Sequence, residues 1–108
     1  VQLSSLGVKF RGGSSSYNYA LSKHALEFFP ADHIDWASHN VFVNAIRVGV
    51  TDTRFHRNDP TKDIKKRISL IPAGRMATTE EIAQAVYALG SDDNTFTTGQ
   101  IIAVAGGE

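Results

Sequence analysis

The apolar positions along the chain fall into short continuous runs, and longer amphipathic stretches separate them. Val1–Ser4 is strand-like, and Ile101–Val104 is another short apolar run that leads into Gly106-Gly107. The strongest strand pattern is Val41–Val48, which is β-branched and almost continuously apolar, as in a strand covered on both faces. The chain is therefore predicted to contain three strands with helices between them.

The first long stretch predicts a helix that begins near Ser16 and runs towards His39, after a loop rich in Gly and Ser. Pro30 lies inside this span. Because proline lacks a backbone N–H, it should kink the helix or end it early. Asn40 is a suitable C-terminal stop.

Two further helices are predicted between the second and third strands. After the polar turn that follows Gly49, a basic helix is expected over Thr61–Leu70. Thr78 and Glu81 then form a capping box, in which each side chain accepts a hydrogen bond from the other residue's backbone N–H. The helix that they open ends at Gly90, and its apolar face consists of Ile82, Ala85, Val86 and Leu89.

Strands separated by helices need crossover connections, which make neighbouring strands parallel. The pattern predicts an α/β fold with three parallel strands, equivalent to half of a doubly wound open sheet. Such a half has exposed strand edges and one uncovered face. Val1 is not an initiator methionine and already lies in a predicted strand, so we expect a fragment that begins inside a sheet.

Composition narrows the class of protein without naming a function. An apolar fraction of 42% and a charged fraction of 20% over 108 residues are typical of one soluble globular domain or part of one. No apolar run approaches the roughly 20 residues that span a bilayer, and no signal-peptide pattern occurs. The absence of cysteine excludes disulfides and thiolate metal sites, and it fits a cytoplasmic protein.

A net charge of zero gives no electrostatic reason to expect nucleic-acid binding. One segment is nevertheless basic. Between residues 54 and 67, Asp59 and Asp63 are outnumbered by Arg54, Arg57, Lys62, Lys65, Lys66 and Arg67. The favoured interpretation is the solvated face of an amphipathic helix, and the alternative is a basic lid over an anionic substrate.

The clearest candidate for chemistry is the pair Tyr19 and Lys23 in the first predicted helix. Residues i and i+4 lie on one helix face, so the phenol and the ammonium can meet the same ligand. A nearby cation favours the phenolate, and it makes a tyrosine with an ordinary pKa of about 10 suited to general acid–base work. By itself, the spacing is also that of an exposed lysine one turn after a half-buried tyrosine.

Other polar residues carry weaker signals. Tyr17 has Leu21 at i+4 in place of a lysine, so we assign it to lining a substrate pocket or to packing. The histidines have no metal-ligand spacing, and no metal site is predicted. His56 follows the turn after the second strand and is a candidate for substrate contact, whereas Asp52 is interpreted as a turn residue.

Five landmarks in a fixed order carry a resemblance that none of them would carry alone. They are Leu3-Ser4-Ser5, Tyr19-x-x-Ser22-Lys23, Asn44-Ala45-Ile46-Arg47-Val48-Gly49 through Thr53, Ile71-Pro72-Ala73-Gly74-Arg75 followed by Glu80-Glu81-Ile82-Ala83, and Thr98-Gly99-Gln100 with Gly106-Gly107. Over nearly all of its length the chain resembles the C-terminal half of the short-chain dehydrogenase/reductase family. The resemblance implies a Rossmann-like domain of which residues 1–108 are the catalytic half, the N-terminal dinucleotide-binding half being absent.

The resemblance also implies a nicotinamide-dependent oxidoreductase. Tyr19 is implied as the general acid in carbonyl reduction and the base in alcohol oxidation, while Lys23 would lower its pKa and bind the nicotinamide ribose. A serine would orient the substrate oxygen. The family places this serine about 13 residues before the tyrosine, which is Leu6 here. Ser5 is the nearest serine and is preferred, with Ser4 as the alternative.

The implied cofactor is NAD or NADP. By resemblance, the residues that line its site are Tyr19, Lys23, Val48, Gly49, Thr51 and Thr53. Val48 replaces the proline of the family's Pro-Gly pair, whereas Gly49 still lets the backbone approach the cofactor. The acidic or basic residue that selects NAD or NADP in the family belongs to the missing half.

The implied partners are a small carbonyl or alcohol substrate and further copies of the full-length protein, in a homodimer or homotetramer. No nucleic-acid or membrane partner is expected. Because the glycine-rich turn that binds the cofactor pyrophosphate is missing, residues 1–108 alone are expected to be inactive. Two alternatives stay open: an epimerase or dehydratase that uses the same Tyr/Lys pair on a nucleotide sugar, and a non-catalytic fragment that serves only as a subunit.

Overall fold

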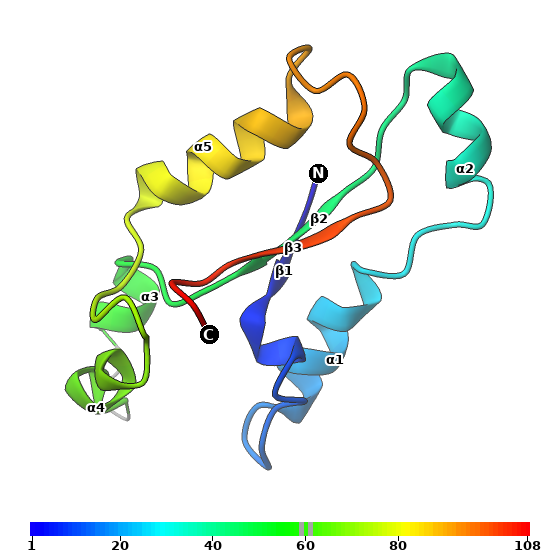
Figure 1. The fold of residues 1–108 in the computed structure, drawn as a ribbon. Helices are drawn as coiled ribbons and strands as arrows, with labels where there is room; N and C mark the ends of the chain where they lie inside the picture. The colour runs from blue at the N-terminus through cyan, green and yellow to red at the C-terminus, as the bar shows by residue number, and fades with distance from the viewer. Residues whose placement is uncertain (59, 61) are drawn as a thin grey trace.

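One parallel sheet forms the centre of the computed structural model, which describes residues 1–58, 60 and 62–108. The strands are β1 (Gln2–Ser5), β2 (Ala45–Val48) and β3 (Ile101–Val104), in the order β1-β2-β3. Gln2 lies opposite Ala45, and Ala45 lies opposite Ile101, so all three carboxyl ends meet at one edge (Figure 1). The predicted α/β fold with three parallel strands is confirmed.

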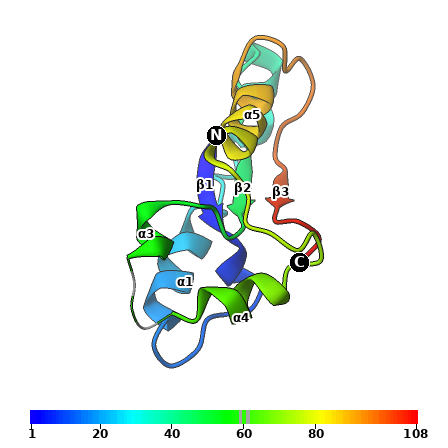
Figure 2. The ribbon, with the colours of Figure 1, turned by 90° about the vertical axis from the view of Figure 1, so that its left-hand side faces the viewer.

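Helices cover both faces of this sheet. α1 (Tyr17–Ala25) and α2 (His33–Trp36) lie on one face, and α5 (Thr79–Gly90) lies on the other (Figure 1 and Figure 2). The remaining helical elements are η1 (Leu6–Val8), η2 (Ala37–His39), α3 (Arg54–Arg57) and α4 (Ile64–Ser69). Because the crossovers run over both faces, the sheet is doubly wound, as predicted.

The helix predicted over residues 16 to 39 is divided into two parts. α1 ends at Ala25, before Pro30, and the chain resumes a helical course only at His33. Pro30 cannot donate a helical hydrogen bond and disfavours helix at the residue before it, so the early end has the predicted cause. Asn40 follows η2 in the left-handed conformation with φ of 58°, which confirms it as the stop.

β2 is shorter than the strand predicted over Val41–Val48, because only its last four residues pair in the sheet. The segment before β2 bonds to the loop that precedes β3. The Val43 N–H donates to Thr98 Oγ1 at 3.0 Å, and its carbonyl accepts from the Gly99 N–H at 2.7 Å. The apolar run indicated burial correctly from Asn44 to Ile46, whereas Val41 is 52% exposed, and its pattern did not distinguish a strand from a loop packed beside one.

α4 occupies Ile64–Ser69, within the basic helix predicted over Thr61–Leu70, and Thr61 itself lies outside the described residues. The helix begins after Asp63, whose Oδ1 accepts a hydrogen bond from the Lys66 N–H at 3.0 Å. The short helix α3 was not predicted, because one helical turn leaves no periodic pattern in a sequence.

α5 matches its prediction closely. Thr78 Oγ1 accepts from the Glu81 N–H at 3.2 Å, and Glu81 Oε2 accepts from the Thr78 N–H at 2.8 Å. These two bonds are the predicted capping box, and the helix ends at Gly90 as expected. Its apolar face is half-buried on the sheet.

The core is centred on β2, where Ala45 and Ile46 have no exposed surface. Buried apolar side chains around it are Leu6, Val8, Ala20 and Ile71. Leu3 on β1 and Ile101 on β3 are 45% and 44% exposed, so the outer strands of this sheet are open, as expected for half of a larger one. None of the described helices combines the length and the apolar character needed to cross a membrane.

Candidate functional site

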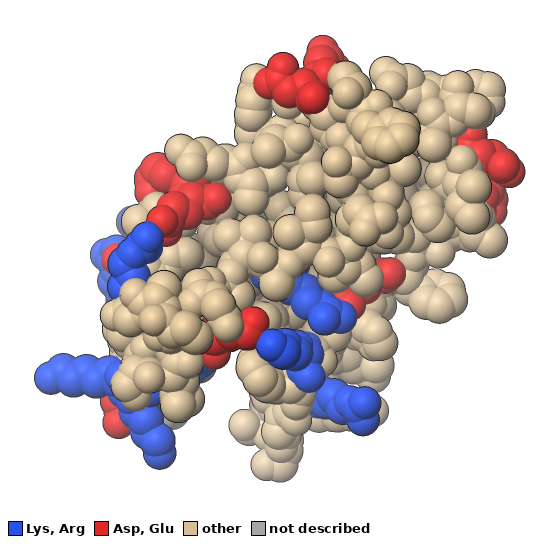
Figure 3. All heavy atoms as spheres, viewed as in Figure 1, with Lys and Arg blue, Asp and Glu red and all other residues tan. Residues whose placement is uncertain are grey.

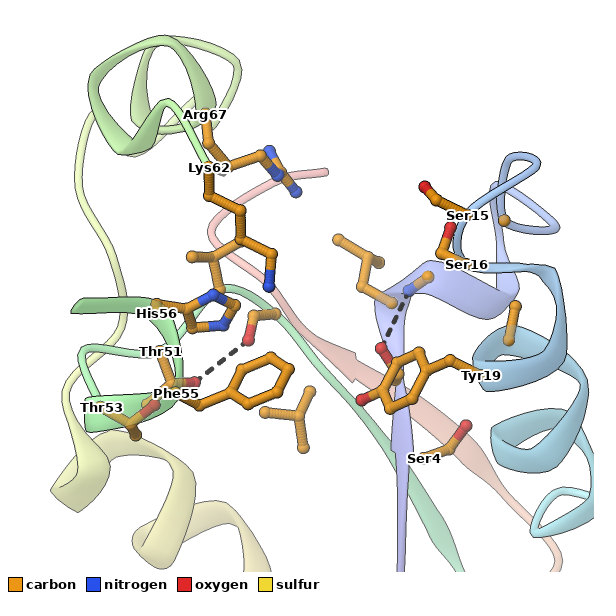
Figure 4. Close-up of a pocket in the computed structure, with 18 residues that line it drawn as sticks. Ser4, Ser15, Ser16, Tyr19, Thr51, Thr53, Phe55, His56, Lys62 and Arg67 are labelled. Carbon is orange, nitrogen blue, oxygen red and sulfur yellow. Dashed lines mark hydrogen bonds between the residues drawn. The ribbon is translucent and has the colours of Figure 1, made fainter. Parts of the chain in front are cut away.

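The carboxyl edge of the sheet opens into a cavity of about 740 Å³. One wall comes from η1, the Ser-rich loop and α1, and the other comes from the turn after β2 and from α3 and α4 (Figure 4). Open α/β sheets bind ligands beyond the carboxyl ends of their strands. The cavity is therefore the candidate site. Its described lining includes most of the predicted site residues, namely Ser5, Tyr19, Val48, Gly49, Thr51, Thr53 and His56, but not Lys23 or Tyr17.

Tyr19 projects from α1 into this cavity, with 47% of its surface exposed (Figure 4). Lys23 lies one turn further along α1, and its Nζ is 5.9 Å from the centre of the Tyr19 ring. The same Nζ donates to the Leu3 carbonyl at 3.0 Å, which ties the ammonium to β1. The phenol and the ammonium thus share one face of α1, as their spacing predicts.

The two candidate serines have different surroundings. Ser4 is 3% exposed, and its hydroxyl donates to Glu27 Oε1 at 2.6 Å and contacts the Lys23 carbonyl at 3.1 Å. Ser5 is half-buried at the cavity wall, and its Oγ accepts from the Gly7 N–H at 3.1 Å. Because that bond uses Ser5 only as an acceptor, its hydroxyl hydrogen is available to a ligand, whereas the hydrogen of Ser4 is already engaged.

The turn after β2 brings the other predicted cofactor-site residues to the cavity, since Val48, Gly49, Thr51 and Thr53 all line it. Gly49 is required by close packing. A Cβ there would lie 2.7 Å from the Ala105 Cα, and the Gly49 N–H donates to the Val104 carbonyl at 2.9 Å. Thr51 is buried, and its Oγ1 donates to the Gly49 carbonyl at 3.1 Å. The close packing at Gly49 and these hydrogen bonds therefore hold the turn in one conformation.

Across the cavity from Tyr19 stand Phe55, His56, Lys62 and Arg67 (Figure 4). The His56 ring meets Phe55 edge-on, with ring centres 5.0 Å apart, and Lys62 Nζ is 4.3 Å from the centre of the Phe55 ring. His56 therefore lines the cavity, and its contact with a substrate stays a prediction. Tyr17 is 58% exposed and is absent from the described residues that line this cavity.

The basic segment combines both of its interpretations. Lys65 and Lys66 are exposed to solvent, as on a solvated helix face, whereas Lys62 and Arg67 line the cavity, as in a basic lid. Lys and Arg gather around the lower hollow of the molecule in Figure 3, and Asp and Glu predominate above it. The run of basic residues was the sequence signal for Lys62 and Arg67, and His56, Thr51 and Thr53 of the same wall were predicted separately. Phe55 and the cavity-lining Ser15 and Ser16 had no sequence signal.

Asp52 is a paired turn residue, as the sequence suggested. Arg57 donates to its two carboxylate oxygens at 2.6 and 2.7 Å, and this fork holds the pKa of Asp52 below its ordinary value. A carboxylate held in this way is a poor proton acceptor near neutral pH. Within the described part of the chain, no three His, Asp or Glu side chains are grouped as metal ligands.

Comparisons with known proteins agree with this geometry. The family described as enoyl-(acyl carrier protein) reductase matches residues 1–108. A 3-oxoacyl-(acyl-carrier-protein) reductase of Thermotoga maritima is 34% identical over 89% of this chain, and the match spans 39% of that protein. An acetoacetyl-CoA reductase of Rhizobium meliloti is 36% identical over 91% of this chain and 42% of its own length.

A solved structure extends the agreement to the fold. It is a putative 2-deoxy-D-gluconate 3-dehydrogenase from Agrobacterium tumefaciens with bound NADP, 31% identical, with a TM-score of 0.80. The match covers 96% of this chain and 43% of that chain, so this chain spans less than half of the relatives that it resembles. Taken with the sheet, the cavity and the paired Tyr19 and Lys23, these matches place the chain in the short-chain dehydrogenase/reductase family.

Proposed function

We propose that the protein carrying this chain is an NAD(P)-dependent oxidoreductase that reduces a carbonyl or oxidises an alcohol. The observation that carries the proposal is the position of Tyr19, which lines the cavity beyond the strands and shares one face of α1 with Lys23. Lys23 itself is not among the described residues that line the cavity. The reductases and the dehydrogenase among its relatives support the same class of reaction.

The residues of the cavity fit a nicotinamide cofactor. The Lys23 ammonium can donate to ribose hydroxyls, and Thr53 offers a hydroxyl from the turn after β2. Gly49 has no side chain, so the backbone at that position can approach a flat ring. When bound, the nicotinamide supplies or accepts the hydride. The NADP in the Agrobacterium relative supports NADP as the cofactor.

The chain's own residues handle the proton and hold the substrate. Tyr19 gives its phenolic proton to the carbonyl oxygen during reduction and takes it back during alcohol oxidation. Lys23 stabilises the phenolate by its positive charge and is itself held by the Leu3 carbonyl. Ser5 donates its hydroxyl hydrogen to the same substrate oxygen, which orients the carbonyl and stabilises the charge that develops on it.

The substrate class that we propose is a 3-oxoacyl thioester. Two of the relatives described above act, by their names, on 3-oxoacyl-(acyl-carrier-protein) and on acetoacetyl-CoA. Thioesters of this kind carry phosphate groups, and Lys62 and Arg67 lie on the wall opposite Tyr19. The charge of Arg67 is partly offset by its ion pair with Glu108, at 2.7 Å. A sugar acid such as that in the Agrobacterium relative's name is the alternative, because its carboxylate suits the same cations.

The test is the Tyr19→Phe variant of the full-length protein, assayed with NADPH and acetoacetyl-CoA. We expect kcat to fall by roughly 10²- to 10⁴-fold, which is the usual contribution of a general acid. The midpoint of thermal unfolding should stay unchanged, because the phenyl ring keeps its packing and Tyr19 is half exposed.

Tyr87→Phe is the matched control, since Tyr87 is 66% exposed on α5 and is not among the described residues of the cavity. It should leave kcat unchanged. A Tyr19→Phe enzyme with wild-type kcat would refute the proposal. Net consumption of NADPH separates an oxidoreductase from an epimerase, which regenerates its cofactor in each cycle.

A further inference from the structure

An ion pair with a buried carboxylate lies beside the candidate site and takes no part in the proton transfer proposed above. Arg47 on β2 donates to Glu27 through Nε to Oε1 at 2.8 Å and through Nη2 to Oε2 at 2.7 Å. Ser4 donates to the same Oε1 at 2.6 Å. The Glu27 side chain is only 2% exposed, so the carboxylate depends on these partners in place of water.

The placement of this carboxylate is costly by itself. Burying an ion carries a desolvation penalty that its partner only partly offsets, and apolar residues of similar size are often as stable. Glu27 also follows the C-terminal end of α1, where the helix dipole disfavours negative charge. Stability alone therefore does not explain why a charged network occupies this position.

The structural elements that this network connects suggest a different role. Ser4 precedes the candidate serine, Ser5, and its hydroxyl also contacts the Lys23 carbonyl at 3.1 Å. Arg47 precedes Val48, where the chain begins the turn that lines the cavity. Glu27 thus joins β1, the end of α1 and β2, and each of these elements carries one part of the site.

The geometry of the bonds suits positioning. A fork between a guanidinium and a carboxylate fixes both distance and orientation, unlike a single contact. Lys23 adds a parallel link, because its Nζ bonds to the Leu3 carbonyl while its own carbonyl contacts Ser4. α1 is therefore held to β1 at two points, and Glu27 extends the connection to β2.

We propose that Glu27, Arg47 and Ser4 are positioning residues, which hold the Tyr19 and Lys23 pair and Ser5 at the correct distance from the turn after β2. This proposal rests on the proposed function. A misplacement of about 1 Å can reduce a rate by roughly 100-fold, so loosening this network should lower turnover without removing any reacting group.

The first test is Glu27→Gln in the full-length protein, which keeps the side-chain volume and an acceptor for Ser4 but removes the charge. We expect kcat to fall by about 10- to 100-fold at a temperature well below unfolding, with the KM for NADPH within about twofold of wild type. A purely structural role would lower the midpoint of unfolding and leave kcat per folded molecule unchanged.

A double variant separates positioning from stability. Glu27→Met together with Arg47→Met replaces the ion pair by apolar side chains of similar length, which commonly restores stability. We expect this protein to unfold near the wild-type temperature but to retain the low kcat of Glu27→Gln. Wild-type kcat in the double variant would overturn the proposal.

Two control variants complete the experiment. Glu81→Gln weakens a second guanidinium–carboxylate fork, from Arg75 Nη1 and Nη2 to Glu81 at 2.9 and 2.6 Å, on the far side of the sheet from α1, and should leave kcat unchanged. Tyr19→Phe reports on the proposed function itself. If it abolishes turnover while the Glu27 variants match wild type, only the positioning role fails. If Tyr19→Phe is fully active, both proposals fail.

Discussion

The polar side chains at the two ends of the sheet differ in how they are hydrogen-bonded. At the amino end Asn44 is 1% exposed, its Nδ2 donates to the Thr97 carbonyl at 2.8 Å, and its Oδ1 accepts from the Gln100 N–H at 3.1 Å. At the carboxyl end Tyr19 is 47% exposed, and the Ser5 hydroxyl hydrogen is available. The amide of Asn44 is paired internally, whereas Tyr19 and the Ser5 hydroxyl hydrogen are open to a ligand, although Ser4 and Thr51 at the same end are bonded within the chain.

A second asparagine repeats the arrangement at the amino end. Asn94 Nδ2 donates to the Leu89 and Thr97 carbonyls at 2.9 and 2.8 Å, and its Oδ1 accepts from the Thr97 N–H at 2.8 Å. The loop before β3 is therefore organised around two amide side chains. Neither of them titrates, so these hydrogen bonds do not depend on pH.

The difference between the ends concerns side chains and does not extend to the backbone. Gly49 at the carboxyl end lies so close to Ala105 that a Cβ would overlap it, and the Gly49 N–H is bonded to β3. The backbone there is as tightly packed as at the amino end. Rigidity of this kind keeps the open side chains in place before a ligand arrives.

The variant expected to affect stability most is Asn44→Ala, which breaks the amino end alone. It removes the side-chain oxygen that accepts from the Gln100 N–H, whereas the Thr97 carbonyl still accepts from Asn94. We expect the free energy of unfolding to fall by roughly 2–4 kcal/mol, from the lost bonds and the cavity. Urea titration measures the loss, and kcat per folded molecule should not change. A fall in kcat comparable to that of Tyr19→Phe would show that the two ends are not independent.

Gly49→Ala tests the tightly packed backbone of the carboxyl end. The added methyl group would overlap the Ala105 Cα at 2.7 Å, so the turn after β2 must move. We expect a loss of about 1–3 kcal/mol in the free energy of unfolding together with weaker NADPH binding, measured by urea titration and by fluorescence. Gly13→Ala is the control, because a Cβ there meets no atom within 4 Å. Unchanged affinity in Gly49→Ala would mean that this turn does not hold the cofactor.

The smallest expected effect is on stability in acid. It depends on the charged side chain of Glu27 and therefore distinguishes this network from the uncharged amides of the amino end. Hydrogen bonding from Arg47 holds the pKa of Glu27 below its ordinary value, despite the opposing effect of burial. A depressed pKa stabilises the fold above the ordinary value of about 4.5 and is lost as pH falls through the folded value. Between pH 5 and pH 3 the free energy of unfolding should therefore fall less in Glu27→Gln than in wild type, as denaturant titrations at both pH values would show. Equal slopes would contradict the prediction, and Asn44→Ala should keep the wild-type slope.

The sequence predicted those parts of the fold that depend on local signals. The capping box of α5, the stop at Asn40 and the three strands each follow from a few neighbouring residues. The early end of α1 was anticipated from Pro30 because a missing N–H acts locally. The start of β2 was mispredicted, because the partner of Val43 lies in a loop far along the sequence.

The candidate site was likewise predictable only where neighbouring residues carry the signal. Spacing alone placed Tyr19 and Lys23 on one helix face, and the position after a strand placed Gly49 and Thr51 at its carboxyl end. Nothing local distinguished Ser4 from Ser5, since their difference comes from Glu27, a distant residue. The roles of the serines, of Tyr17 and of His56 remain predictions for the variants to decide.

The register of the sheet has a consequence for the order in which this molecule forms. Residue 2 pairs with residue 45, and residue 45 pairs with residue 101, so no two neighbouring strands are close in sequence. Each pairing requires closure of a long loop before any contact is gained, whereas α1 and α5 form from local contacts. During refolding, helical signal should therefore return well before ligand binding, because the cavity does not exist until β1 and β2 have met.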